Sequence, residues 1–228
     1  MNNNLKIAIG DTWHPQLLPY FSMSMMALML ITNVLNLKFV DIGGVSVIAS
    51  QITYVLSLIL ADVMTEVYGY RRVRKLLYVG LCFLVLYSLC TQIAVWLPPA
   101  RDYQNEQAFG AVFSQTPRIA IASIAAYFVT ELTNSYIMSR LKVRFRARYF
   151  YGRAVISVGV AQIVNVAAFF GIAFAGVMSL ATIVQAGGVA WIIVMLCEIF
   201  VLPVTKKFAV AIKNKEGVEH FDSNPGSV

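Results

Sequence analysis

Six long apolar runs, separated by short polar segments, dominate the hydrophobic pattern of the chain. Each run has about 20 residues, which is the length an α-helix needs to cross the hydrocarbon core of a bilayer. None of them alternates apolar and polar residues with a period of two, so the pattern predicts helices rather than strands. The predicted membrane spans are residues 17–37, 45–68, 76–97, 117–139, 154–175 and 182–204.

The segments outside these spans predict a simple domain organisation. Residues 41–44 are expected to form a tight turn, and residues 107–113 a short amphipathic helix at the membrane interface. The first apolar run lacks the ordered regions of a signal peptide, so we expect it to be retained. The chain then divides into an N-terminal segment (1–16), one transmembrane domain (17–204) and a basic tail (205–228) that we expect to be disordered.

Composition supports an integral membrane protein over the soluble classes. Of the 228 residues, 59% are hydrophobic and 13% are charged, whereas soluble domains carry about 25% charged residues. The three cysteines lie inside apolar runs and are odd in number, so no disulfide framework is predicted. The predicted fold class is therefore an all-α integral membrane protein with six transmembrane helices.

The basic residues lie mainly on one side of this predicted bundle. Of the 18 Lys and Arg residues, only Lys38, Arg101 and Arg118 lie elsewhere. By the positive-inside rule, both termini are predicted to be cytoplasmic. We therefore expect the net charge of +7 to meet anionic lipid headgroups rather than nucleic acid. The clustered residues are Lys6, Arg71, Arg72, Arg74, Lys75, Arg140, Lys142, Arg144, Arg146, Arg148, Arg153, Lys206, Lys207, Lys213 and Lys215.

Four acidic residues fall inside the predicted spans. An ionisable side chain at such a depth costs at least about 2.5–3.5 kcal/mol on insertion scales, which makes each one a functional candidate. Asp62 and Glu66 are four residues apart on the second span and share a helix face. Glu131 lies on the fourth span and Glu198 on the sixth.

Two further polar pairs, each spaced by three residues, lie on neighbouring antiparallel spans at overlapping depths. Hydrogen bonds between helices, worth about 0.6 kcal/mol each, are the structural alternative for such groups. A layer that also contains acids instead favours a cavity for a flat small molecule rich in hydrogen-bond donors. The pairs are Glu131 with Asn134 and Gln162 with Asn165, and Asn33 and Ser157 can join them at the same level.

Catalytic and cofactor motifs are missing from the sequence. It contains no G-x-S-x-G, H-E-x-x-H or P-loop motif, and no Cys/His spacing typical of a metal site. His14 and His220 lie in the terminal segments. We therefore expect no enzymatic activity, no cofactor and no metal.

Several short motifs, in a consistent order, carry a resemblance to one family. The most specific is D-x-x-x-E-V-Y-G, from Asp62 to Gly69. Over about residues 20–205 the chain resembles the queuosine precursor transporters, also called the vitamin uptake transporter family. The other matching positions are Asn33 to Lys38, Gly43-Gly44, Gln115 to Ile119, Ser123, Tyr127, Arg140-Leu-Lys142, and Arg153, Ser157 and Gln162 in R-x-x-x-S-x-x-x-x-Q spacing.

This resemblance implies an inner-membrane importer of 7-deazaguanine bases, chiefly 7-cyano-7-deazaguanine or its aminomethyl relative. It also implies a fold like that of the substrate-binding subunits of energy-coupling-factor transporters, working without an ATPase module in this chain. The family usually has Gln and Asp where this chain has Glu131 and Asn134, and Asp where it has Asn165. One acid and one amide still share a helix face, and together they can satisfy the donors and the carbonyl of a guanine edge.

The residues and the resemblance together predict a substrate site, with the lipid bilayer and a small-molecule base as the expected partners and no nucleic acid. Arg118 is assigned to the entrance, with snorkelling toward the interface as the alternative. Tyr127 or Phe128 is assigned to stacking on the base, with apolar filling as the alternative. A transporter of another vitamin or nucleobase and a non-transporting membrane scaffold are the other candidate functions. Proton symport and facilitated diffusion are both compatible with the sequence, and the oligomeric state is open. The predicted binding residues are Asn33, Ser57, Asp62, Glu66, Glu131, Asn134, Ser157, Gln162 and Asn165.

Overall fold

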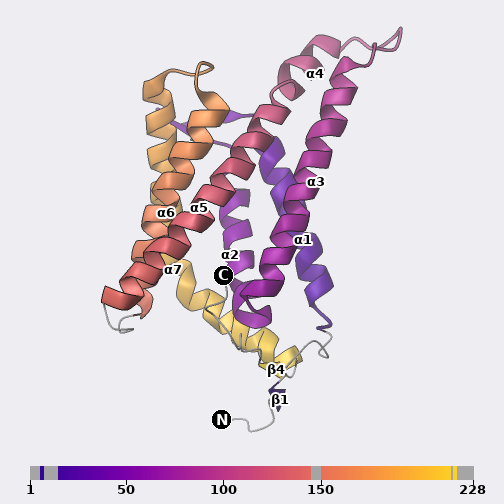
Figure 1. The fold of residues 1–228 in the computed structure, drawn as a ribbon. Coiled ribbons are helices and arrows are strands. Elements are labelled where there is room, and N and C mark those ends of the chain that lie inside the picture. Colours follow the sequence, from indigo (N-terminus) through magenta and orange to yellow (C-terminus); the bar gives the residue numbers. More distant parts are fainter. Residues whose placement is uncertain (1–5, 8–14, 145–149, 217, 220–228) are drawn as a thin grey trace.

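The computed structural model describes residues 6–7, 15–144, 150–216 and 218–219. Within these residues the chain forms seven α-helices and two small two-stranded sheets (Figure 1). The helices are α1 (Leu18–Leu35), α2 (Gln51–Tyr68), α3 (Tyr70–Trp96), α4 (Glu106–Phe113), α5 (Thr116–Arg144), α6 (Phe150–Phe174) and α7 (Leu180–Glu216). The strands are β1 (Lys6–Ile7), β2 (Phe39–Ile42), β3 (Val45–Ile48) and β4 (Val218–Glu219).

Each of the six apolar runs lies mostly on one of the long helices. Four helices in the described part of the chain are long and apolar enough to cross a membrane: α1, most of α3, most of α6 and the first half of α7. The two remaining long helices, α2 and α5, carry three of the four acids that were predicted to lie in the membrane. The prediction of an all-α membrane protein agrees with this structure, while six spans and cytoplasmic termini stay predictions.

A β-hairpin precedes α2, where the sequence analysis predicted the start of a membrane span. Strands β2 and β3 pair antiparallel, with Ile42 opposite Val45. The predicted turn at residues 41–44 is confirmed: Gly43 and Gly44 have φ of 63° and 81°, which suits the tight primed turns of hairpins. The helix in the second predicted span therefore begins at Gln51 rather than residue 45, because the β-branched residues before it pair as strands.

The third helix also begins earlier than predicted. Gly69, with φ of 82°, separates α2 from α3, and α3 begins at the next residue. A backbone conformation with positive φ is accessible to glycine at little cost, so the chain changes direction within one residue. The basic residues from Arg71 to Lys75, predicted as a loop, therefore form the first turns of α3. The helix predicted at 107–113 is present as α4, and its place at the membrane interface stays a prediction.

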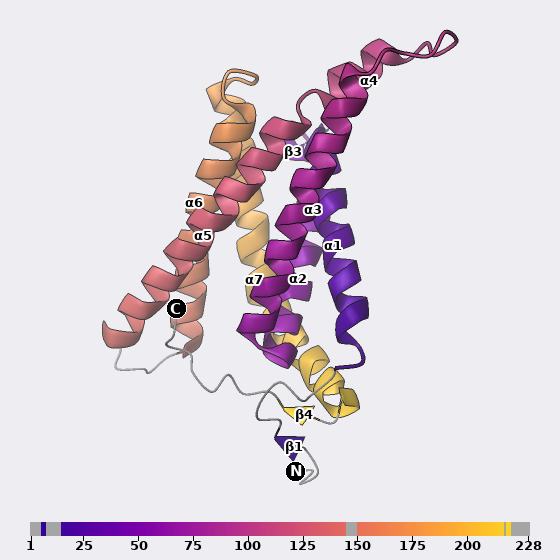
Figure 2. The same ribbon diagram turned by 45° about the vertical axis from the view of Figure 1, so that its right-hand side comes forward.

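Helix α7 continues far beyond the predicted sixth span. The tail from residue 205 was expected to be disordered, but the helix reaches Glu216. Its last part passes beneath α1, α2 and α3, as the views of Figure 1 and Figure 2 both show. Ala209 and Ile212 are buried there, and this burial explains why a polar tail stays helical. Residues 217 and 220–228 lie outside the described residues, as do 1–5 and 8–14.

Two apolar clusters hold the bundle together at opposite ends. At the hairpin end, Ile48 packs with residues of α5, α6 and α7, including Phe170 and Phe174. At the other end, which we call the α7 end, Ile212 packs with Met64 and other residues of α1, α2 and α3. The interior between these clusters is where the polar side chains of the helices meet.

Candidate functional site

A cavity of about 450 Å³ lies inside the bundle between the two apolar clusters. All six long helices contribute to its wall. Its size falls within the range of about 300–1,000 Å³ that is typical of small-molecule sites. The bundle therefore contains an internal space large enough for a vitamin-sized or base-sized ligand.

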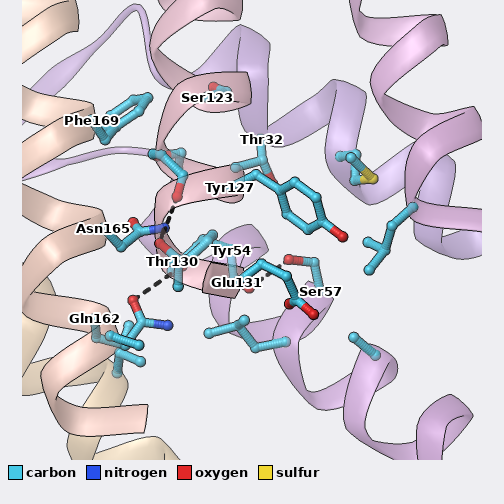
Figure 3. Close-up of a pocket in the computed structure, with 18 of the residues that line it drawn as sticks. Thr32, Tyr54, Ser57, Ser123, Tyr127, Thr130, Glu131, Gln162, Asn165 and Phe169 are labelled. Atoms are coloured by element: carbon cyan, nitrogen blue, oxygen red, sulfur yellow. Dashed lines mark hydrogen bonds between the residues drawn. The ribbon is translucent and has the colours of Figure 1, made fainter. Parts of the chain in front are cut away.

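Most of the residues predicted from the sequence to bind substrate line this cavity, and only two do not. They come from α1, α2, α5 and α6, so residues far apart in the chain share one space (Figure 3). Their contact with a substrate stays a prediction. The predicted residues in the wall are Asn33, Ser57, Asp62, Glu131, Asn134, Gln162 and Asn165.

Ser157, one of the two exceptions, is fully buried behind the wall. Its hydroxyl donates to the backbone oxygen of Asn134 at 2.9 Å and also to the side-chain oxygen of Asn134. Ser157 therefore orients a cavity residue without lining the cavity itself. Glu66, the other exception, is 60% exposed at the α7 end, where its carboxylate pairs with the Lys213 ammonium at 2.8 Å.

Arg118, assigned to the entrance, lies at the hairpin end of α5. Its guanidinium donates to the backbone oxygen of Ile172 at 2.7 Å and to that of Ala175. These carbonyls belong to the end of α6, where backbone acceptors lack partners within the helix. Arg118 therefore ties α5 to α6, and its role at an entrance stays a prediction.

The amide side chains in the wall hold defined orientations. Figure 3 shows Asn165 donating from Nδ2 to the Thr130 hydroxyl, at 2.9 Å. It also shows the Tyr54 hydroxyl bonded to Gln162 Oε1, at 3.3 Å. Both bonds join α6 to another helix, so the polar layer connects helices as well as lining the cavity. Such bonds fix which amide atoms remain for a ligand.

Charged groups of both signs line the cavity. The predicted spans end at residue 68 and resume at residue 76, so Arg74 was expected to lie between them. Because α3 begins directly after Gly69, Arg74 lies on a helix and lines the same cavity as Asp62 and Glu131. Its Nε donates to the Tyr78 hydroxyl at 2.8 Å. The wall therefore contains two acids and one arginine.

Several polar wall residues were missed by the sequence analysis. On α2, Gln51 and Tyr54 precede the predicted Ser57 at three-residue intervals, so they share its helix face. This spacing was the signal that could have identified them. The amide nitrogen of Gln51 donates to the backbone oxygen of Ala190, at 3.3 Å. The other missed polar residues are Thr32, Asn36, Ser50, Thr65, Ser123 and Thr130.

The two residues predicted to stack on a base, Tyr127 and Phe128, differ in their position relative to the cavity. Tyr127 extends from α5 into the cavity (Figure 3). Phe128 is 43% exposed on the outside of the bundle and stacks with Tyr78 at 6.3 Å between ring centroids. Of the two, only Tyr127 is placed to meet a ligand. The side chain of Glu198 lies outside the described residues, as do Arg146 and Arg148.

Comparison with known proteins gives the cavity a family context. The sequence profile of the family described as "Putative vitamin uptake transporter" matches residues 48–207. The chain is also 25% identical over 146 residues to a "Probable queuosine precursor transporter" from Bacillus subtilis (strain 168). That match covers 64% of each protein, so it spans less than two thirds of the relative. No solved structure matches the chain.

The profile match contains the helices that supply most of the cavity wall, namely α2, α3, α5, α6 and the first part of α7. An internal polar cavity enclosed by apolar helices is the arrangement expected of a carrier for small molecules. The chain belongs to the vitamin uptake transporter family, a family of membrane transporters.

Proposed function

We propose that the protein imports a queuosine precursor, a planar base of the 7-deazaguanine type, across the inner membrane. In this proposal six helices span the membrane, both termini are cytoplasmic, and no ATPase module is part of the chain. The observation that carries the proposal is the internal cavity of about 450 Å³, lined by acids and amides from several helices. The name of the Bacillus subtilis relative supports the choice of substrate.

The chemistry of the wall suits such a base. A guanine-type edge presents neighbouring N–H donors beside a carbonyl acceptor. The carboxyl group of Glu131 offers acceptor oxygens, while the side-chain amides of Gln162 and Asn165 offer both donors and acceptors. With one arginine against two acids, the cavity is poorly suited to a phosphate or carboxylate substrate.

The cavity also bears on the alternative of a non-transporting scaffold. A scaffold would use its intramembrane polar groups to bond helix to helix and would pack them closely. Here the bonds between helices, such as that from Asn165 to Thr130, border an open volume instead. A transporter role accounts for both features.

The proposal is tested by uptake in a host that cannot make its own queuosine precursor. The variants Glu131→Ala and Asn165→Ala are expected to lower queuosine in tRNA roughly tenfold or more at limiting precursor, because hydrogen bonds to a charged or buried partner are lost. Asn105→Ala, at an exposed site outside the cavity, is the control. Undiminished uptake by both cavity variants would contradict the proposed site.

A further inference from the structure

The amide oxygen of Asn33 is a buried acceptor with no partner. Asn33 is 3% exposed and lines the cavity. Its Nδ2 donates to the Ser123 hydroxyl at 3.3 Å, whereas its Oδ1 has no hydrogen-bond partner among the described residues. Buried polar atoms are nearly always paired, so an unpaired one in a cavity wall indicates an acceptor kept for a ligand.

The position of Asn33 is defined by the helix to which it bonds. Ser123, Tyr127 and Glu131 are spaced by four residues on α5 and all line the cavity (Figure 3). At 1.5 Å per residue, Ser123 and Glu131 lie about 12 Å apart along this helix face. Ser123, Tyr127 and Glu131 thus form a polar stripe along α5. Asn33 lies at the hairpin end of this stripe, and Glu131 lies toward the α7 end.

A fused two-ring base matches a stripe of this length, with one hydrogen bond of about 2.9 Å at each end. In a 7-deazaguanine the 2-aminopyrimidinone edge and the pyrrole N–H lie at opposite ends of the ring system. The carboxylate of Glu131 suits the edge that carries two donors. Asn33 Oδ1, a single acceptor, suits the single donor at the other end. The ring of Tyr127 lies between these two residues along the stripe.

We propose that Asn33 Oδ1 accepts the pyrrole N–H of the base and so selects free bases over their nucleosides. A nucleoside carries its sugar on this nitrogen and has no N–H to donate. A site built around such a hydrogen bond discriminates strongly, because a ligand without the donor leaves the buried acceptor unpaired. This inference rests on the proposed function. It assigns the discrimination between base and nucleoside to the pyrrole end of the substrate.

The test compares two ligands of the same shape on the purified full-length protein. One is the 7-deazaguanine base, and the other is its furo analogue, in which a ring oxygen replaces the pyrrole N–H. We expect calorimetry to show wild-type protein binding the base roughly tenfold or more tightly than the analogue, because one buried donor is lost. Asn33→Leu is expected to bind both ligands with equal affinity.

Two further variants separate this role from a general effect on folding. Asn33→Asp keeps an acceptor oxygen and should retain the preference for the base. Tyr87→Phe removes a buried hydroxyl on α3 outside the cavity wall and should bind as the wild type does. Equal binding of both ligands by the wild type, or an unchanged preference in Asn33→Leu, would overturn the role of Asn33 alone. Failure of the wild type to bind either ligand would instead overturn the proposed function.

Discussion

At the scale of single residues, position relative to the cavity separates side chains of the same chemical type. Ser57 lines the cavity, Ser157 is buried behind its wall, and Ser88 is buried on α3 away from it. The sequence predicted Ser57 and Ser157 alike as binding residues, although only Ser57 lines the cavity. Only the contacts in the structure indicate which of these hydroxyls acts on the site.

Ser157 offers a first prediction. Ser157→Ala removes both hydrogen bonds to Asn134, so that amide loses its fixed orientation in the cavity wall. We expect a loss of stability of about 0.5–1.5 kcal/mol and a several-fold loss of uptake. Ser88→Ala, also at a buried serine, should leave uptake unchanged. Equal uptake by the two variants would show that the orientation of Asn134 does not matter.

The neighbouring aromatic residues on α5 offer a second prediction. A base stacked on an aromatic ring gains about 1–3 kcal/mol, and of Tyr127 and Phe128 only Tyr127 lines the cavity. Tyr127→Ala is therefore expected to raise the Kd for the base roughly tenfold or more. Phe128→Ala, which alters a ring on the outer surface, should leave the Kd unchanged in the same titration. A larger rise in Kd for Phe128→Ala than for Tyr127→Ala would contradict the placement of the Tyr127 ring in the cavity and the Phe128 ring outside it.

At the scale of elements, one carboxylate at the end of α7 connects this helix to the start of α1 and the end of α2. The carboxylate of Glu216 accepts the backbone N–H groups of Gln16 and Leu17, at 3.0 and 2.7 Å, just before α1 begins. It also accepts the Tyr68 hydroxyl at the end of α2, at 3.1 Å. An acid at a helix N-terminus satisfies free N–H groups and opposes the positive end of the helix dipole. Glu216 therefore acts as a cap supplied from about 200 residues away in the chain.

Removing this cap should destabilise the protein without touching the cavity. Glu216→Ala is expected to lower the free energy of unfolding by about 1–2 kcal/mol, as the loss of a helix cap does. Lys215→Ala, at the exposed neighbouring position, is the matched control and should have little effect. Thermal unfolding of both variants in detergent measures the difference. A Glu216→Ala variant as stable as the control would mean that the cap contributes nothing.

The elements themselves were largely predictable from local pattern, and the exceptions have local or tertiary causes. The second strand of the hairpin, β3, was included in a predicted span because its apolar residues adjoin the next apolar run, and the first strand, β2, was left between two spans. The helical tail of α7 was missed because it is polar overall. It stays helical through the burial of Ala209 and Ile212 against α1, α2 and α3. Such packing does not appear in any window of sequence.

At the scale of the whole molecule, the cavity lies between two apolar ends. Ile48 and the phenylalanines around it fill the hairpin end, and Ile212 and Met64 help to fill the α7 end. Asn36 and Gln51, toward the hairpin end of the wall, are buried, whereas Asp62, toward the α7 end, is exposed. The cavity is thus better shielded at the hairpin end than at the α7 end.

The orientation of this arrangement in the membrane yields a fourth prediction. In a variant without the three native cysteines, a single cysteine at Tyr103 should react with an impermeant thiol reagent in intact cells. A single cysteine at Asn214 should react only after the inner membrane is permeabilised. Both native side chains are exposed, so access to reagent depends on the side of the membrane. Labelling of position 214 in intact cells would contradict cytoplasmic termini.

The sequence by itself determined the helical class, the positions of the long apolar helices and the family. It could do so because span length, hydrophobic pattern and motif order are properties of continuous stretches of chain. Only the tertiary structure decided that Glu66 pairs with Lys213 outside the cavity wall and that Arg74 lines the cavity. It also decided that the amide oxygen of Asn33 has no hydrogen-bond partner in the described part of the chain. These outcomes depend on how each helix is rotated and packed against its neighbours, and side chains distant in sequence set that packing.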